Sequence, residues 1–196
     1  MNDANTRKRQ LDELASSLLA IDPADTERRL ARFIEALGPM KELRLCVTGG
    51  AGSGKTSFTT AVSRAFGVPV YDFDEYIEGG YHPDGPAYLA RLEAARQKLW
   101  LALPQEGGWL VEHVESCNED MVKLLKPTHC AIIEPSIEYI RKVAAARSQA
   151  ADDGPVLAAE REKRALESRE YARMQFEKVG GKVLFSKSGT TLKKLG

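Results

Sequence analysis

Apolar residues from position 43 onward follow two alternating patterns. Five short apolar runs, each the length of a strand, are separated by longer stretches with apolar residues at helical spacing. The runs are "LRLCVT", "VPVYDF", "WLVEHV", "THCAII" and "KVLF". The longest helical stretches are "YLARLEAARQKLWLAL", which ends at Pro104, and "VLAAEREKRALESREYARMQFEKV". Short buried strands that alternate with helices predict a parallel α/β sheet flanked by helices.

The first 39 residues carry only the helical pattern. Leucines recur from Leu11 to Leu18, Asp22-Pro23 is a helix start signal, and Gly38-Pro39 is a stop signal. The second apolar stripe consists of Leu30, Phe33, Ile34 and Leu37. We therefore predict an N-terminal helical extension (1–39) before an α/β domain (40–196). This extension is either a packing appendage or a surface for oligomerisation or a partner.

Composition limits the partners and the cellular compartment that we expect for the protein. The 196 residues include 28 basic and 28 acidic side chains, so net charge gives no general attraction to nucleic acid or anionic membranes. No apolar run reaches the roughly 18–20 residues of a membrane span. The charged N-terminal segment is unlike a signal peptide, and three cysteines without a CxxC pair indicate reduced thiols. We expect a cytoplasmic protein with no membrane partner.

The segment "GGAGSGKT" matches the phosphate-binding pattern G-x-x-x-x-G-K-[ST] in full, between a predicted strand and a predicted helix. Backbone N–H groups of such a loop surround a β-phosphate, its lysine reaches the β- and γ-phosphates, and its hydroxyl is a ligand for Mg²⁺. The sequence therefore predicts ATP and Mg²⁺ as cofactors. The predicted nucleotide-binding residues are Gly49, Gly50, Ala51, Gly52, Ser53, Gly54, Lys55, Thr56 and Ser57.

Two aspartates end the second predicted strand, in "YDFDEYIE". Spaced by two on an extended strand, Asp72 and Asp74 are expected to share one face at the carboxyl end of the sheet, where open α/β folds bind ligands. Carboxylates at that place can hold a metal shell and accept a proton from a hydroxyl. The alternative is a polar strand end that caps a following helix.

The combination of "GGAGSGKT" with "DFDEYIE" resembles the small P-loop kinases, including shikimate, gluconate and nucleotide kinases. The resemblance implies a P-loop NTPase fold with a five-stranded parallel sheet of order 2-3-1-4-5. It also implies that Asp72 supports Mg²⁺ and that Asp74 binds the acceptor hydroxyl and helps to deprotonate it. The glycine run and the Phe-Arg pair of shikimate kinases are absent, which argues against shikimate as the acceptor.

Residues near the third strand complete the predicted acceptor side. The segment around Glu112 resembles uridine-kinase-like proteins, in which a carboxylate at this place positions Mg²⁺ or the acceptor; a packing role for Glu112 stays open. Arg91, on the following helix, is a candidate acceptor ligand. His113 points to the opposite face from Glu112 and is expected to pack or to lie at the surface. The many carboxylates of "DFDEYIE" and "EHVESCNED" predict a neutral acceptor.

Arginines between the fourth and fifth strands are candidates for a mobile lid, at about 147–165. Arginines over the reacting phosphate stabilise the charge that spreads over its equatorial oxygens. Arg147 and Arg161 flank the predicted loop "DDG" and are the first choices as catalytic residues. The alternating Glu and Arg of 160–173 equally describe a solvated helix face.

Together these patterns predict an ATP-dependent kinase that phosphorylates a hydroxyl group, with Lys55 and Asp74 as catalytic residues. The acceptor is a small molecule, a nucleoside or nucleotide, or a modified base hydroxyl in DNA. DNA draws support from the lysines of "GKVLFSKSGTTLKKLG". The alternative is a regulatory module that binds nucleotide without phosphoryl transfer. The base-reading motif N-K-x-D of GTPases is absent from the sequence.

Overall fold

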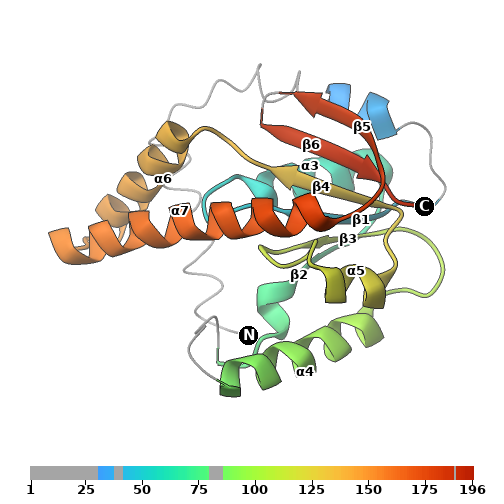
Figure 1. Ribbon diagram of the computed structural model, residues 1–196, viewed down its shortest axis with the longest axis horizontal. Helices are drawn as coiled ribbons and strands as arrows, with labels where there is room; N and C mark the ends of the chain where they lie inside the picture. The colour runs from blue at the N-terminus through green and yellow to red at the C-terminus, as the bar shows by residue number, and fades with distance from the viewer. Residues whose placement is uncertain (1–30, 38–41, 80–85, 188) are drawn as a thin grey trace.

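A computed structural model describes residues 31–37, 42–79, 86–187 and 189–196. Strands and helices alternate along most of this chain (Figure 1). The elements are β1 (Arg44–Thr48), α3 (Lys55–Phe66), β2 (Val70–Asp72), the 3₁₀ helix η1 (Phe73–Tyr76), α4 (Pro86–Ala102), β3 (Trp109–Glu112), α5 (Glu119–Leu125), β4 (His129–Ile133), α6 (Ile137–Ala150), α7 (Pro155–Lys178), β5 (Lys182–Lys187) and β6 (Thr190–Lys194).

The strands form one six-stranded sheet with the order β2-β3-β1-β4-β6-β5. The first four strands are parallel, as predicted, and their order 2-3-1-4 is also the predicted one. The prediction was wrong at the far edge. The strand beside β4 is β6, which runs antiparallel to it, and β5 lies outside β6. The polar segment "TTLKK" has only one buried residue, Leu192, which explains why its sequence gives no strand signal.

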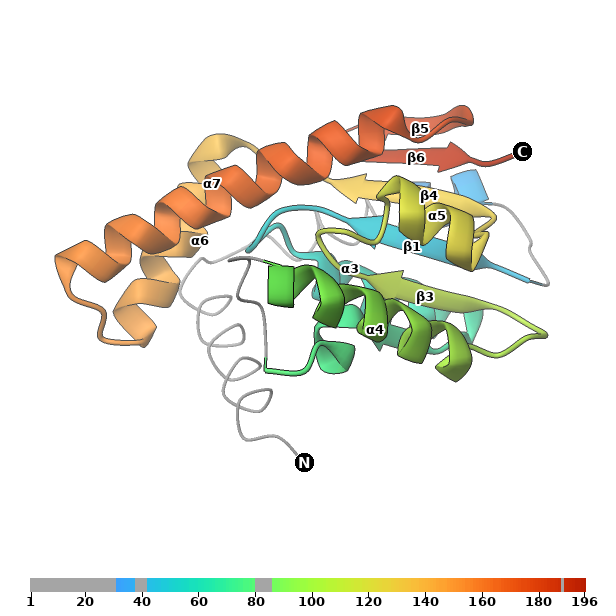
Figure 2. The same ribbon diagram turned by 60° about the horizontal axis from the view of Figure 1, so that its bottom comes forward.

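Both faces of the central strands are buried, because helices cover the sheet on two sides (Figure 2). On one side Cys46 and Val111 pack with residues of α4 and α5. On the other side Leu45, Val47 and Leu110 pack against α3. Strands buried on both faces read as continuous apolar runs, which is the pattern of a parallel sheet. The three cysteines are free and buried.

Residues 31–37 are helical and belong to the second of these cores. Phe33 is fully buried, with its ring edge-on to Phe58 of α3 and to Phe185 of β5. Leu37 is buried beside it. The rest of the predicted N-terminal extension, residues 1–30 and 38–39, lies outside the described residues.

Helices α6 and α7 form a hairpin that projects beyond the carboxyl ends of the parallel strands (Figures 1 and 2). The phosphate-binding loop follows β1 at this same end. A short connection joins the two helices, and Asp152 in it adopts a left-handed backbone (φ 55°). Within the described parts of the chain, the helices are all too short or too polar to cross a membrane.

Candidate active site

The loop between β1 and α3 forms a glycine-rich cradle at the start of the helix. Gly52 and Gly54 have positive φ values of 76° and 89°, which glycine adopts without a steric penalty. Gly54 is the N-cap of α3, and neither a side-chain cap nor an acidic residue occupies the first turn of that helix. The N–H groups of an uncapped helix end carry partial positive charge and bind anions. The geometry of the loop therefore fits a phosphate group.

Lys55 lies across the mouth of this cradle. Its amino group donates to the backbone oxygens of Gly49 at 2.8 Å and Gly50 at 3.0 Å. One turn later, the hydroxyl of Thr59 donates to the Glu112 carboxylate at 2.8 Å. The first turns of α3 thus connect the loop to the end of β3.

Two carboxylates on adjacent strands face this end of α3. Asp72, the last residue of β2, pairs in register with Glu112, the last residue of β3. Burial raises the pKa of Glu112, and the Asp72 charge raises it further. The hydrogen bonds from Thr59 and Thr56 and the charge of Lys55 lower the same pKa. Glu112 is therefore within electrostatic reach of Asp72, Lys55 and Thr56.

This donor set suits Mg²⁺, which prefers oxygen ligands and keeps sites open for phosphates and water. Thr56 supplies a hydroxyl, and Asp72 and Glu112 supply carboxylates. No group of three or more His, Cys, Asp and Glu among the described residues is arranged to hold a metal by itself. A Mg²⁺ ion at this place would accordingly share its coordination with nucleotide phosphates. The metal roles of Thr56, Asp72 and Glu112 stay predictions.

The two aspartates do not share an extended strand, which corrects the sequence interpretation. β2 ends at Asp72, and Asp74 lies in the 3₁₀ turn η1. The Asp72 carboxylate caps this turn by accepting a hydrogen bond from the Asp74 N–H at 3.0 Å. The capping role left open as an alternative is therefore present. Because Asp74 lies in a turn and not on the strand, the alternation of faces along an extended strand does not apply to it.

Asp74 instead contacts His113, a residue for which the sequence indicates a packing or surface role. His113 Nε2 lies 3.1 Å from Asp74 Oδ1, and the imidazole is buried. The expectation that His113 faces away from Glu112 holds, since Glu112 contacts α3 and His113 contacts η1. The contact could not be read from sequence, because 39 residues separate the partners.

The predicted lid arginines take different positions. A Cβ built on Gly52 would lie 3.6 Å from Arg147 Nη1, which places this guanidinium at the phosphate-binding loop. Arg161 pairs with Asp153, with distances of 2.8 Å from Nε and 2.6 Å from Nη2 to Oδ2. Arg161 thus holds the tip of the α6–α7 hairpin. A catalytic role for either arginine stays a prediction, with Arg147 the better placed.

Helix α7 also packs directly on the loop, a contact without a sequence signal. The Ala51 N–H donates to Ser168 Oγ at 2.8 Å. A Cβ on Gly50 would lie 2.7 Å from the backbone of Arg169, so only glycine allows this approach. Arg169 anchors the helix by pairing with Glu134 at 2.9 Å, just after β4. The loop is therefore fixed between α3 and α7.

Arg91 lies in the second turn of α4, and its side chain reaches the segment that directly follows η1. Its Nη1 donates to the Glu78 backbone oxygen at 3.0 Å, and its guanidinium lies 5.8 Å from the Tyr88 ring centroid. Its predicted acceptor contact remains a prediction.

The expected excess of negative charge on the acceptor side is smaller than the sequence indicates. Arg96 lies within 3.5 Å of both Glu115 and Asp120, Lys123 pairs with Glu119, and Lys98 pairs with Glu78. Basic residues of α4 and α5 thus pair with four of the eight carboxylates in "DFDEYIE" and "EHVESCNED". The other four are Asp72, Asp74, Glu75 and Glu112, at or just after the carboxyl ends of β2 and β3.

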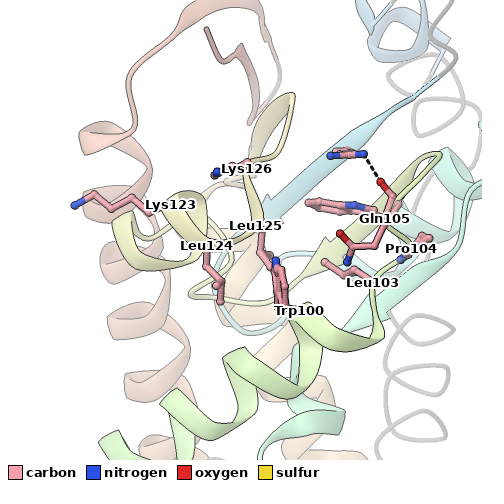
Figure 3. Close-up of a pocket in the computed structure, with 10 residues that line it drawn as sticks. Trp100, Leu103, Pro104, Gln105, Lys123, Leu124, Leu125 and Lys126 are labelled. Carbon is pink, nitrogen blue, oxygen red and sulfur yellow. Dashed lines mark hydrogen bonds between the residues drawn. The ribbon is translucent and has the colours of Figure 1, made fainter.

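A cavity of about 430 Å³ lies at the other end of the sheet (Figure 3). Its lining includes Arg44 and Trp109, which begin β1 and β3, and Trp100 of α4. Figure 3 shows Trp100 directed from α4 toward Leu125. The length of the central strands separates this cavity from the phosphate-binding loop.

No protein-family model matches the chain, and no curated relative matches it. Solved structures do resemble it. A protein from Silicibacter sp. TM1040 described as a fructose transport system kinase aligns with a TM-score of 0.51 and 13% identity, over 84% of this chain and 94% of that one. Shikimate kinase from Bacteroides thetaiotaomicron aligns with a TM-score of 0.47 and 19% identity, over 69% of this chain and 82% of that one.

A chain of the Pnkp1/Rnl/Hen1 RNA repair complex aligns with a TM-score of 0.49 and 16% identity, over 73% of this chain. The present chain spans about half of that one, 49%. At such identities the similarity concerns the fold. With the complete phosphate-binding loop, the chain has a P-loop kinase-like fold.

Proposed function

We propose that this protein is an ATP-dependent kinase that transfers the γ-phosphoryl group to a hydroxyl acceptor. One observation carries the proposal: the uncapped start of α3, with Lys55 and Thr56, faces the paired carboxylates of Asp72 and Glu112. Asp74 follows directly in η1 and is held by a buried histidine. The same end of the sheet thus offers an anion cradle, oxygen ligands for a cation, and a candidate base.

Nucleotide binding would use the Lys55 amino group, which is hydrogen-bonded to loop carbonyls in this structure, and the backbone N–H groups at the start of α3. The Lys55 amino group would exchange the carbonyls of Gly49 and Gly50 for the β- and γ-phosphates. The N–H groups at the start of α3 would bind the phosphate oxygens. Thr56, Asp72 and Glu112 would hold Mg²⁺, which neutralises charge on the phosphates when it is bound.

In the transfer step, the acceptor oxygen attacks the γ-phosphorus in line with the β–γ bridging oxygen. A new O–P bond forms, the bond from the γ-phosphorus to the bridging oxygen breaks, and ADP leaves. The hydroxyl proton passes to the Asp74 carboxylate, which acts as general base. Arg147, whose guanidinium lies beside Gly52, would stabilise charge on the transferred group.

The proposed class of acceptor has less support from the structure than the proposed type of reaction. A small molecule or a nucleoside-type compound needs only to bring one hydroxyl group to Asp74. A DNA hydroxyl draws support from fewer of the C-terminal lysines than the sequence indicates. Lys193 donates to the carbonyls of Phe176 and Val179, while Lys182 and Lys194 pair in register beside the start of β4, away from the loop. Lys187 pairs with Thr190 beside Ile133, at the end of β4 that lies on the side of the loop.

The test is a phosphoryl-transfer screen with γ-labelled ATP and pooled acceptors: nucleosides, nucleotides, sugars, small acids and DNA with hydroxymethylated bases. ATP binding is measured in parallel by calorimetry. Lys55→Ala should abolish most transfer, by roughly 10²–10³-fold, as for loss of one charge-stabilising donor. Lys123→Ala, an exposed lysine of α5 paired with Glu119, is the matched control.

The outcomes separate the kinase from its alternative. Transfer that requires Lys55 supports the kinase. ATP binding that requires Lys55, with no transfer to any acceptor or to water, would favour the regulatory module. Equal activity of Lys55→Ala and Lys123→Ala would overturn the assignment of the loop.

A further inference from the structure

Backbone hydrogen bonds and a ring contact hold His113 in place, although it lies in a short segment after β3. Its backbone N–H donates to Val47 O at 3.2 Å, and its carbonyl accepts from Ser116 Oγ at 3.0 Å. Its ring meets the buried Phe73 ring edge-on, with 5.0 Å between centroids. A buried aromatic contact of this kind restricts rotation of the imidazole.

The hydrogen bonds of the imidazole determine its tautomer. The Glu115 backbone N–H lies 3.1 Å from Nδ1, and a backbone N–H can only donate. Nδ1 is therefore the unprotonated nitrogen, and the proton of the neutral ring is on Nε2. It follows that Nε2–H donates to Asp74 Oδ1, at 3.1 Å.

From these contacts we infer that His113 is a positioning residue for Asp74, an inference that rests on the proposed function. The bond to Oδ1 fixes the rotation of the carboxylate and so the direction in which its second oxygen faces. Because η1 is a single short turn, the Asp72 cap fixes its backbone only, and the side chain of Asp74 needs a further contact. Orientation of a base within hydrogen-bond reach is what general-base catalysis requires.

Two substitutions separate the contributions of the two ring nitrogens. His113→Asn keeps an acceptor near the position of Nδ1 for the Glu115 N–H and loses the donor to Asp74. His113→Gln places an amide N–H near the position of Nε2 and keeps that donor. His129→Asn is the matched control, because His129 is equally buried but begins β4 at the opposite end of the sheet.

The kinetic experiment uses the full-length protein, ATP, and the acceptor found in the screen, or water as acceptor in single-turnover ATP hydrolysis. We expect His113→Asn to lower kcat by roughly 10–10²-fold, as misplaced catalytic groups do, with the KM for ATP within about 2-fold. His113→Gln should recover most of this loss. In the Asp74→Asn background, His113→Asn should have little further effect, because the two residues act as one unit.

A second measurement does not depend on turnover. Long-range ¹H–¹⁵N NMR spectra of the imidazoles report which nitrogen carries the proton, and His113 is identified among the three histidines by its loss in His113→Asn. We expect the Nε2–H form, with a proton shift that changes in Asp74→Asn. An Nδ1–H form would overturn the inference, as would multiplicative effects of the two substitutions on kcat. A wild-type protein that transfers no phosphoryl group to any acceptor, water included, would overturn the proposed function, even with the NMR contact intact.

Discussion

Asp74 is the residue on which the proposed chemistry depends most directly. Asp74→Asn keeps the shape of the side chain and an oxygen for His113, but it removes the base. We expect kcat to fall by roughly 10²–10⁴-fold, the range for a positioned general base, with ATP affinity within a few-fold of wild type. Calorimetry with ATP and initial rates with the acceptor measure the two separately. Lost ATP affinity with normal kcat would instead make Asp74 part of the metal shell.

Glu112 offers a pH test that needs no acceptor. Burial is the largest cause of its raised pKa, so the native state holds the carboxyl proton more tightly than the unfolded chain does. Ionisation of Glu112 therefore costs stability, and this cost grows as pH rises from near the ordinary value of 4.5 through the native pKa.

Glu112→Gln removes this cost while keeping an oxygen that accepts from Thr59. The free energy of unfolding of the variant, relative to wild type, should therefore rise between about pH 4 and about pH 7. Urea denaturation at both pH values, without nucleotide or Mg²⁺, measures the difference. A relative stability that falls over this range would show that interactions with Thr59, Lys55 and Thr56 outweigh burial.

At the scale of elements, sequence patterns identify those strands and helices whose apolar residues are buried in the core. All four parallel strands and the helices α3, α4, α6 and α7 follow from their periodicity, and their order follows from a family resemblance. β6 was missed because an edge strand next to solvent needs few apolar residues. α5 was missed because its capping residue, Asn118, lies within a segment that reads as an acidic loop.

The same distinction applies to the candidate site: features that are local in sequence were predicted, and features that depend on contacts between distant elements were not. The phosphate-binding loop is local in sequence, so its residues and their spacing were sufficient to identify it. The roles around Asp74 depend on contacts between elements. Asp74 lies in the 3₁₀ turn after β2 and not on the strand, and its partner His113 comes from another strand end. Ser168 reaches Ala51 across 117 residues, a contact that no periodicity predicts.

The close packing of α7 on the loop leads to a prediction at Gly50. A Cβ at this position meets backbone atoms of Arg169 at 2.7 Å, which side-chain rotation cannot relieve. Gly50→Ala should therefore push α7 outward and destabilise the fold by about 1–3 kcal/mol, the range for overpacking. Gly180→Ala is the control, because a Cβ there has no neighbour within 4 Å among the described residues. Chemical denaturation of both variants would show equal stabilities if α7 does not rest on the loop.

At the scale of the whole molecule, the site is assembled at one end of a sheet whose two faces have separate cores. The core around Cys46 and Val111 supports η1 and α4, on the side of Asp74. The core around Val47 and Leu110 supports α3, and so the phosphate-binding loop. Substitutions in the second core should affect the loop through stability alone, because its residues lie beneath α3.

Phe33 tests how far this second core extends. Its fully buried ring joins residues 31–37 to Phe58 of α3 and Phe185 of β5, three segments that are distant in sequence. Phe33→Ala should lower the free energy of unfolding by about 3–5 kcal/mol, the range for a large buried aromatic residue. Glu35→Ala, on the exposed side of the same helix, should change it by less than about 0.5 kcal/mol. ATP affinity of folded Phe33→Ala should stay near wild type, because the ring contacts α3 behind the loop and not the loop itself. Denaturation curves that place both variants at the same stability would show that residues 31–37 do not belong to the folded core in solution.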